Sequence, residues 1–424
     1  MKRAALWPAL APALAAIFGC NLTASGGSSN GQDFAQKERG RYLVTAADCA
    51  ACHDDPVDHA PFAGGRAIET PFGTVVAANI TPDRDTGIGG WSDAQFDDAV
   101  RHGRRPDGSR LYPAMPYPYY TKLSAADVSA MRAYLRTVPA ISHSVVSNRL
   151  PFPFNVRAGM LVWDELYFNP GQYRWNDAKS AEWNRGAFLV QGPGHCGACH
   201  TPKTFLGGDK TAEELRGYKT QGWFAPDILR SGGGGLDGWS AADTVSYLKS
   251  GHNRFAAASG PMAEEVAMSS SKLTDGDLQD IAVYLEDPDL KGVGARRNDR
   301  PGALRADDPV MKAGSAIYSD LCASCHRSDG AGVAFLIPNL SASASVASHD
   351  PTTLIRVVLL GADSVATRQE PTAPAMPSFA WQLSDAEIAA VTTYVRNAWN
   401  HAAPPVAESD VREARKLLAA RSQP

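Results

Sequence analysis

Three copies of one short string constrain this 424-residue chain more than any other feature. Each copy has two cysteines separated by two residues, with a histidine directly after the second. Six of the seven cysteines lie in these strings, and Cys20 stands alone. A string that recurs at long intervals indicates a structural module repeated along the chain. The copies are Cys49–His53, Cys196–His200 and Cys322–His326.

The string C-x-x-C-H is the attachment signal for c-type haem. Two cysteines on one helical turn can form thioethers with the two vinyl groups of a porphyrin, and the adjacent histidine can then bind the iron. A zinc site usually brings two cysteine pairs into one small unit, and a thioredoxin-like pair stands in a βαβ pattern. Disulfides between the strings are the remaining alternative. We expect three covalently attached haem c groups, bound by Cys49, Cys52, His53, Cys196, Cys199, His200, Cys322, Cys325 and His326.

The sequence around each string repeats with it. A glycine followed by apolar and aromatic residues precedes each string. After each string a hydroxyl residue stands three positions before an acid, which is the pattern of a helix-capping box, and a tyrosine follows seven residues later. We therefore expect the first and last helices of each module to cross, with the glycine against the tyrosine. The predicted pairs are Gly40 with Tyr134, Gly186 with Tyr284 and Gly314 with Tyr394, and the predicted boxes are Ser124–Asp127, Thr274–Asp277 and Ser384–Glu387.

These repeats predict an all-α fold of three tandem class I cytochrome c domains, each with crossed terminal helices around a covalent haem. The segment between the first two domains has many aromatic residues, so we expect it to pack across the modules. The tail is expected to form a short, charged, solvated helix. The predicted order is a signal peptide (1–19), a flexible tether (20–34), domain one (35–145), an aromatic and proline-rich linker (146–177), domain two (178–290), a linker (291–307), domain three (308–402) and a charged tail (403–424).

The second axial ligand of each iron is predicted to be a methionine, because His/Met ligation raises the haem potential and suits electron transfer. Met115 and Met376 both lie in the tetrapeptide Pro-Ala-Met-Pro, shortly before a capped helix. In the second module Met262 follows a Gly-Pro pair, and Met268 is its competitor. The rival ligands are His102 and His252, but the third module has no counterpart to them. The predicted iron ligands are His53 with Met115, His200 with Met262, and His326 with Met376.

The N-terminus has the layout of an export signal. Lys2 and Arg3 precede an apolar stretch, Ala4–Gly19, that is too short and too rich in proline for a membrane span. The residues Ile17–Cys20 resemble a bacterial lipobox, which predicts lipidation of Cys20 and a chain anchored on the periplasmic side of a bacterial membrane. Ordinary signal cleavage slightly further on is the alternative. One acyl chain anchors weakly, so we expect further acyl chains or a partner to share the anchoring.

Composition excludes some other functions. With 41 basic and 45 acidic side chains the formal net charge is −4, which leaves no electrostatic footprint for nucleic acid. Charged residues make up 20% of the chain, so it is not a disordered polyelectrolyte. We find no nucleophile–base pair, flavin fingerprint or carboxylate dyad with a motif around it. The sequence therefore predicts no catalytic residues in this chain.

Three further stretches carry a family resemblance. Gly87–Ser92, Leu111–Tyr119 and Asn79–Pro82 resemble the triheme cytochrome c subunits of bacterial membrane-associated dehydrogenases, which act on alcohols, gluconate, sorbitol or fructose. Similar cytochromes serve molybdenum hydroxylases acting on aldehydes or N-heterocycles. The resemblance covers nearly the whole mature chain. It implies haem at the three strings, methionine ligation at Met115, Met262 and Met376, and a catalytic partner that is a flavoprotein, a quinoprotein or a molybdenum enzyme.

The sequence thus predicts an electron-transfer subunit that is not an enzyme by itself. We expect it to accept electrons from a dehydrogenase subunit and relay them through three haems to ubiquinone, a terminal cytochrome or an oxidase. One alternative is a self-contained multihaem redox enzyme resembling a peroxidase, which would need a haem with an open sixth position. A haem-based sensor is the other. Each module offers a methionine for the sixth position, and this favours electron transfer over both.

Overall fold

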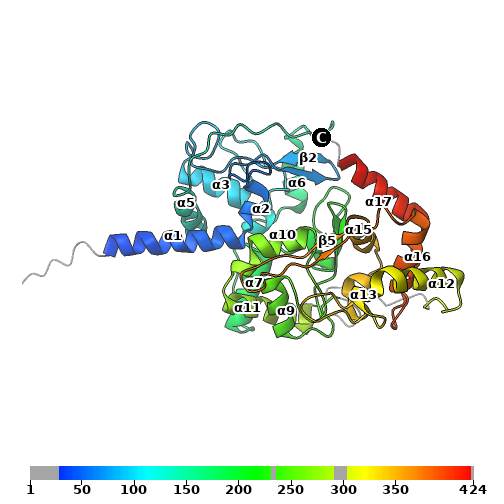
Figure 1. Ribbon diagram of the computed structural model, residues 1–424. Coiled ribbons are helices and arrows are strands. Elements are labelled where there is room, and N and C mark those ends of the chain that lie inside the picture. The colour runs from blue at the N-terminus through cyan, green and yellow to red at the C-terminus, as the bar shows by residue number, and fades with distance from the viewer. Residues whose placement is uncertain (1–27, 231–234, 291–302, 422–424) are drawn as a thin grey trace, which may run out of the picture.

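The computed structural model describes residues 28–230, 235–290 and 303–421, with side chains from 31 to 419. The predicted signal peptide, Cys20, most of the tether and most of the linker 291–307 lie outside these residues. We call the predicted domains 35–145, 178–290 and 308–402 modules one, two and three. Figure 1 shows module two, in green, between module one, in blue and cyan, and module three, in yellow to red.

The polypeptide is mostly helical. Module one contains α1 (Ser28–Ala46), α2 (Cys49–His53), β1 (Ala67–Thr70), β2 (Gly73–Val76), α3 (Asp93–His102), α4 (Tyr117–Tyr120) and α5 (Ala125–Leu135), and α6 (Gly159–Tyr167) follows in the linker. Module two contains α7 (Ala181–Gln191), α8 (Gly197–His200), η1 (Thr211–Glu213), β3 (Tyr218–Thr220), β4 (Trp223–Ala225), α9 (Ala241–Ser250), α10 (Pro261–Met268), η2 (Ser270–Lys272), α11 (Asp275–Leu285) and η3 (Pro288–Leu290).

Module three begins with α12 (Pro309–Ile317), which continues through a π-helical segment, η4 (Tyr318–Cys322), into the third string. The remaining elements are α13 (Ala323–His326), η5 (Leu340–Ala342), α14 (Ala344–Ala347), α15 (Thr352–Leu360), β5 (Ala362–Asp363), β6 (Ala375–Met376), α16 (Asp385–Val395) and the tail helix α17 (Glu408–Arg421). None of the described helices is long and apolar enough to span a lipid bilayer.

Three pairs of helices cross, as the repeats predict: α1 with α5, α7 with α11, and α12 with α16. The crossings need glycine, because a Cβ atom at Gly40, Gly186 or Gly314 would overlap a backbone carbonyl of the partner helix. The predicted tyrosine contact is confirmed at the second and third crossings, where such a Cβ would lie 2.9 Å from Tyr284 Cβ and 2.6 Å from Tyr394 Cβ. At Gly40 the three nearest atoms belong to Ala130 and Met131 instead, before Tyr134 in α5.

The capping boxes are present at α5 and α16, where Ser124 pairs with Asp127 and Ser384 with Glu387. At α11 only half of the box forms: Thr274 accepts from the Asp277 N–H, but the Asp277 side chain does not return to Thr274. The Tyr42 hydroxyl takes the place of the missing contact, because it accepts from the Thr274 N–H at 3.1 Å and donates to the Asp277 carboxylate.

The all-α expectation is met only in part, because the described residues also form three antiparallel two-stranded sheets: β1 with β2, β3 with β4, and β5 with β6. The first two hairpins turn tightly through glycines with positive φ, Gly73 at 115° and Gly222 at 75°. Their strands have only three or four residues, too few to show a period-2 pattern in the sequence. The third sheet has two residues in each strand and places Met376 on β6.

The linker 146–177 contacts both of the modules that it connects. Arg149 forms an antiparallel bridge with Thr74 in module one. The Trp163 indole N–H of α6 donates to the Leu206 carbonyl in module two, at 2.9 Å. The tail helix α17 differs from the solvated helix that we expected, because Val411 is fully buried in the module three core and Arg415 donates to Asp385 at 2.8 Å.

Candidate functional site: a shared cofactor cavity

The three strings open into one continuous cavity with a volume of about 2060 Å³. A pocket for one small molecule has roughly 300–1,000 Å³, so this space is large enough for several cofactors. Its walls are mostly apolar. All nine cysteines and histidines of the strings line it, and so do Met115, Met262 and Met376.

The string histidines are held in one orientation. The Nδ1 of His53 lies 2.7 Å from the Ala78 carbonyl oxygen, the Nδ1 of His200 lies 2.7 Å from that of Pro226, and the Nδ1 of His326 lies 3.3 Å from that of Pro338. A carbonyl can only accept, so Nδ1 carries the proton and Nε2 keeps its lone pair for a metal. Burial lowers the pKa of each of these histidines, which favours the neutral, ligating form.

A second repeated feature supports these histidines, and the string motif alone does not reveal it. The accepting carbonyl is followed each time by an Asn or Asp whose side-chain oxygen accepts a backbone N–H further on: Asn79 from Thr81, Asp227 from Leu229 and Asn339 from Ala342. A glycine with positive φ also donates to each histidine carbonyl; these glycines are Gly64, Gly217 and Gly332. In the sequence, these carbonyls are marked by a repeated triplet of Ala or Pro, then Asn or Asp, then Ile or Leu. The triplets begin at Ala78, Pro226 and Pro338.

The string cysteines are unpaired. All six are free, so the described residues contain no disulfide between strings. Burial raises the pKa of Cys52 and of Cys322 to about 11 and that of Cys196 to about 12. Among the described residues no three His, Cys, Asp or Glu side chains come together as a metal cluster, so the zinc alternative gains no support. Two thiols and a histidine beside an apolar cavity are the donor set that fits a c-type haem.

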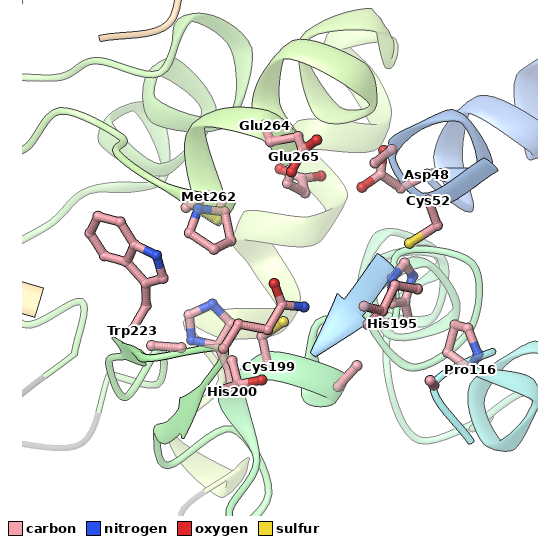
Figure 2. A pocket seen from close by; sticks show the side chains of 18 of the residues that line it. Asp48, Cys52, Pro116, His195, Cys199, His200, Trp223, Met262, Glu264 and Glu265 are labelled. Carbon is pink, nitrogen blue, oxygen red and sulfur yellow. The ribbon is translucent and has the colours of Figure 1, made fainter. Parts of the chain in front are cut away.

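The candidate methionines reach the cavity from different elements. Met115 lies in a tight turn whose Tyr117 N–H donates to the Met115 carbonyl at 2.7 Å. Met262 lies in the first turn of α10, and Figure 2 shows it near His200 and Trp223. Met376 lies on β6. Met131 and Met160 also line the cavity, whereas the competitor Met268 and the rival ligands His102 and His252 do not.

The first two strings come close together where modules one and two meet. The Tyr119 hydroxyl of module one donates to Asp209 of module two, and the Tyr120 ring packs edge-to-face on His195 with centroids 5.6 Å apart. Lys203 donates to the Gly197 carbonyl inside the second string, at 2.8 Å. The junction therefore holds the cofactor sites of modules one and two at a fixed spacing.

Modules two and three meet along the β3–β4 hairpin. The backbone N–H of Phe224 donates to Thr353 Oγ1 at 2.9 Å, and the same hydroxyl donates back to the Phe224 carbonyl at 2.9 Å. The guanidinium of Arg356 lies over the Trp223 ring, 4.6 Å from its centroid. Because Trp223 and Thr353 both line the cavity, this junction continues it into module three.

Comparisons with known proteins agree with this site. The cytochrome c family matches residues 37–139 and 311–399, in modules one and three. The chain is 36% identical over 398 residues to the fructose dehydrogenase cytochrome subunit of Gluconobacter japonicus, covering 89% of this chain and 82% of that one. It is 37% identical over 401 residues to the gluconate 2-dehydrogenase cytochrome c subunit of Pantoea cypripedii, covering 89% of both. A third relative, the cytochrome c subunit of alcohol dehydrogenase (quinone) from Gluconobacter oxydans, is 35% identical over 428 residues, which is 95% of this chain and 87% of that one.

Fold and site thus define a c-type cytochrome. The chain belongs to the family of dehydrogenase cytochrome c subunits to which these three relatives belong.

Proposed function

We propose that this chain carries three haem c groups and relays electrons from a catalytic dehydrogenase subunit to ubiquinone or another respiratory acceptor. The observation that carries the proposal is the single cavity lined by all three strings and by one candidate methionine in each module. Cofactors that share a cavity can exchange electrons at short range. The relatives, whose names make them cytochrome subunits of dehydrogenases acting on fructose, gluconate and alcohols, support a catalytic partner.

Each type of residue in the cavity would have a different role. The cysteine pairs would hold each porphyrin covalently, and His53, His200 and His326 would bind iron through Nε2. Met115, Met262 and Met376 would supply the sixth ligand, which raises the reduction potential. Bound haem iron supplies the one-electron chemistry. The protein sets the ligands, the burial and the spacing, and this proposal assigns no catalytic residue to the chain.

We further propose that Cys20 is lipidated and that the chain works on the periplasmic side of a bacterial membrane. The lipobox-like residues before Cys20 support this placement. The intact mass of the mature chain tests it, because a diacylated N-terminal cysteine adds a large and diagnostic mass. An unmodified N-terminus at any other residue would remove the anchor.

Two measurements test the electron-relay proposal. A pyridine haemochrome titration together with the intact mass should give three haems per chain, and fewer than three in fully matured protein would refute that count. Gentle solubilisation followed by affinity purification should bring along a flavoprotein, quinoprotein or molybdenum subunit. Adding the substrate of that subunit should then reduce the haems. Rapid peroxide turnover by the isolated chain would instead favour the peroxidase-like alternative.

A further inference from the structure

The helix that carries Met262 is held by module one as well as by its own module. Helix α10 begins at Gly260 and Pro261, and Gly260 is packed so closely on the Trp223 ring that a Cβ there would lie 2.7 Å from it. Another part of α10 packs against α2, which is the first cofactor string. Figure 2 shows the α10 residues Glu264 and Glu265 between the His200 side of the cavity and α2, where Asp48 and Cys52 lie.

Arg66 makes this contact specific. It lies in module one just before β1, and its guanidinium forms a bidentate ion pair with Glu264 of α10, with Nη2 2.7 Å from Oε2 and Nη1 on Oε1. The same Nη1 donates to the Ala51 carbonyl inside the first string. Bidentate arginine–carboxylate pairs fix orientation as well as distance. One side chain therefore joins the first string to the helix that carries Met262.

The rest of this junction is made of buried acids. Figure 2 shows that Asp48 and Glu265 face each other next to Glu264. Burial raises the pKa of Asp48 to about 9 and that of Glu265 to about 7, and the charge on Glu265 adds to the shift at Asp48. Arg66 and Lys272 are the cations that act on Asp48. Without Arg66, the Glu264 carboxylate would lose its ion-pair partner beside two buried acids, and the side-chain link between α10 and the first string would be broken.

We propose that Arg66 is a positioning residue for Met262, so that ligation of the second haem depends on module one through the Arg66–Glu264 pair. The inference rests on the proposed ligation by Met262. Met262 lies two residues before Glu264 in α10. A displacement of this short helix therefore moves the sulfur that has to reach the iron. The consequence is a coupling between neighbouring cofactor sites that needs no contact between the cofactors themselves.

The test is the substitution Arg66→Met in the full chain, with haem content verified at three per chain. We expect the long-wavelength absorption band of oxidised, methionine-ligated haem to lose about one third of its intensity, because one of three irons loses its sulfur. The reduced variant should bind carbon monoxide at one haem per chain, and the midpoint potential of that haem should fall. Arg66→Lys keeps the positive charge but cannot form the bidentate pair, so it should show a smaller change in the band. It also provides a readout if the Arg66→Met protein does not mature.

Arg185→Met is the matched control. Arg185 makes a bidentate pair with Asp277, which lies in α11 and not in α10, and its side chain is 36% exposed, against 35% for Arg66. It should leave the band and the carbon monoxide binding unchanged. The double variant Arg66→Glu with Glu264→Arg reverses both charges of the pair. It should recover part of the absorption band that Arg66→Met loses. If Arg66→Met acted only by a general loss of packing, the double variant would not recover the band.

Met262→Leu separates this inference from the assignment on which it rests. If Met262→Leu removes a third of the band while Arg66→Met leaves both the band and the midpoint potentials unchanged, the coupling is wrong and the ligation stands. If Met262→Leu itself changes nothing, the ligand assignment fails. An equal response to Arg185→Met and Arg66→Met would also overturn the specific role of Arg66.

Discussion

The proton on Nδ1 of each string histidine determines which nitrogen can bind iron. Each ring donates to a backbone carbonyl, so the Nε2 lone pair is available on the other side. The contact is longest in module three, at 3.3 Å for His326 against 2.7 Å for His53. The His326 ring is thus the least firmly held of the three. Its carbonyl partner, Pro338, is also the one nearest in sequence to its histidine.

The first prediction concerns the sixth ligand of module one. Met115→Leu should lower the midpoint potential of one haem by on the order of 0.1 V, because loss of a methionine ligand removes its stabilisation of the reduced iron. A potentiometric titration followed at the visible haem bands measures this. His102→Ala is the control, since His102 does not line the cavity. A shift with His102→Ala and none with Met115→Leu would make His102 the ligand.

The second prediction concerns Glu265, whose pKa is raised to about 7 by burial. The folded protein therefore holds this proton more tightly than the unfolded chain, and stability falls as the pH rises from about 4.5 to about 7. Glu265→Gln removes this loss. The stability of the variant relative to the parent should therefore be about 3 kcal/mol more favourable at pH 8 than at pH 4.5. Urea unfolding at both pH values measures the difference.

The control for that comparison is Glu413→Gln, which changes an exposed acid on α17. Its effect on the free energy of unfolding should be the same at both pH values. If the Glu265 variant behaves like this control, the side chain is not buried in the mature protein.

Helix crossings are the elements on which each module is built, and glycine makes them possible. Gly186→Ala should destabilise the protein by about 1–3 kcal/mol, because the new Cβ would overlap the Asp280 carbonyl of α11. Gly276→Ala is the control in that same helix: its nearest non-neighbouring atom would be 4.0 Å away, and it should stabilise by about 0.4–1 kcal/mol. Thermal unfolding of both variants checks the pair. Equal effects would mean that the crossing is not tightly packed.

The helix pairs could be predicted because their signals are local. Gly186, the Thr274–Asp277 pattern and Tyr284 each occur at a fixed place relative to a string, and the repeats reinforce one another. The hairpins could not, since strands of two to four residues show no periodicity. The half-formed box at Thr274 has a tertiary cause, because the Tyr42 hydroxyl of module one stands between the Thr274 N–H and the Asp277 carboxylate.

In the candidate site too, the residues of local motifs could be predicted and the long-range contacts could not. The string cysteines and histidines were predictable from motif and spacing, as were Met115, Met262 and Met376, and all of these residues line the cavity. The carbonyl partners were missed, because they lie 25, 26 and 12 residues away from their histidines, and the repeated triplet that marks them does not by itself indicate a contact. The pair of Arg66 with Glu264 joins residues 198 positions apart, and no pattern in the sequence connects them.

At the scale of the whole molecule, module two is the centre of the assembly. Ala46 of α1 is buried in the module two core, and Tyr42 packs against it. Phe188 of module two in turn packs against the module one core. On the other side, Val365 of module three is buried together with Ala258 and Val266. Module two therefore shares packed surfaces with both of its neighbours.

This arrangement predicts that losing the second cofactor site disturbs the neighbouring modules more than losing the third. Replacing Cys322 and Cys325 with alanine should reduce the haem content from three to two per chain and leave amide hydrogen exchange in α1 and α7 unchanged. Replacing Cys196 and Cys199 should increase exchange in both α1 and α15, because an apolar cavity without its cofactor loosens the core that both neighbours pack on. Haem titration and hydrogen exchange measure the two variants side by side. If the Cys196/Cys199 variant keeps two haems and normal protection in α1 and α15, the modules are independent units and the shared cavity has no structural consequence.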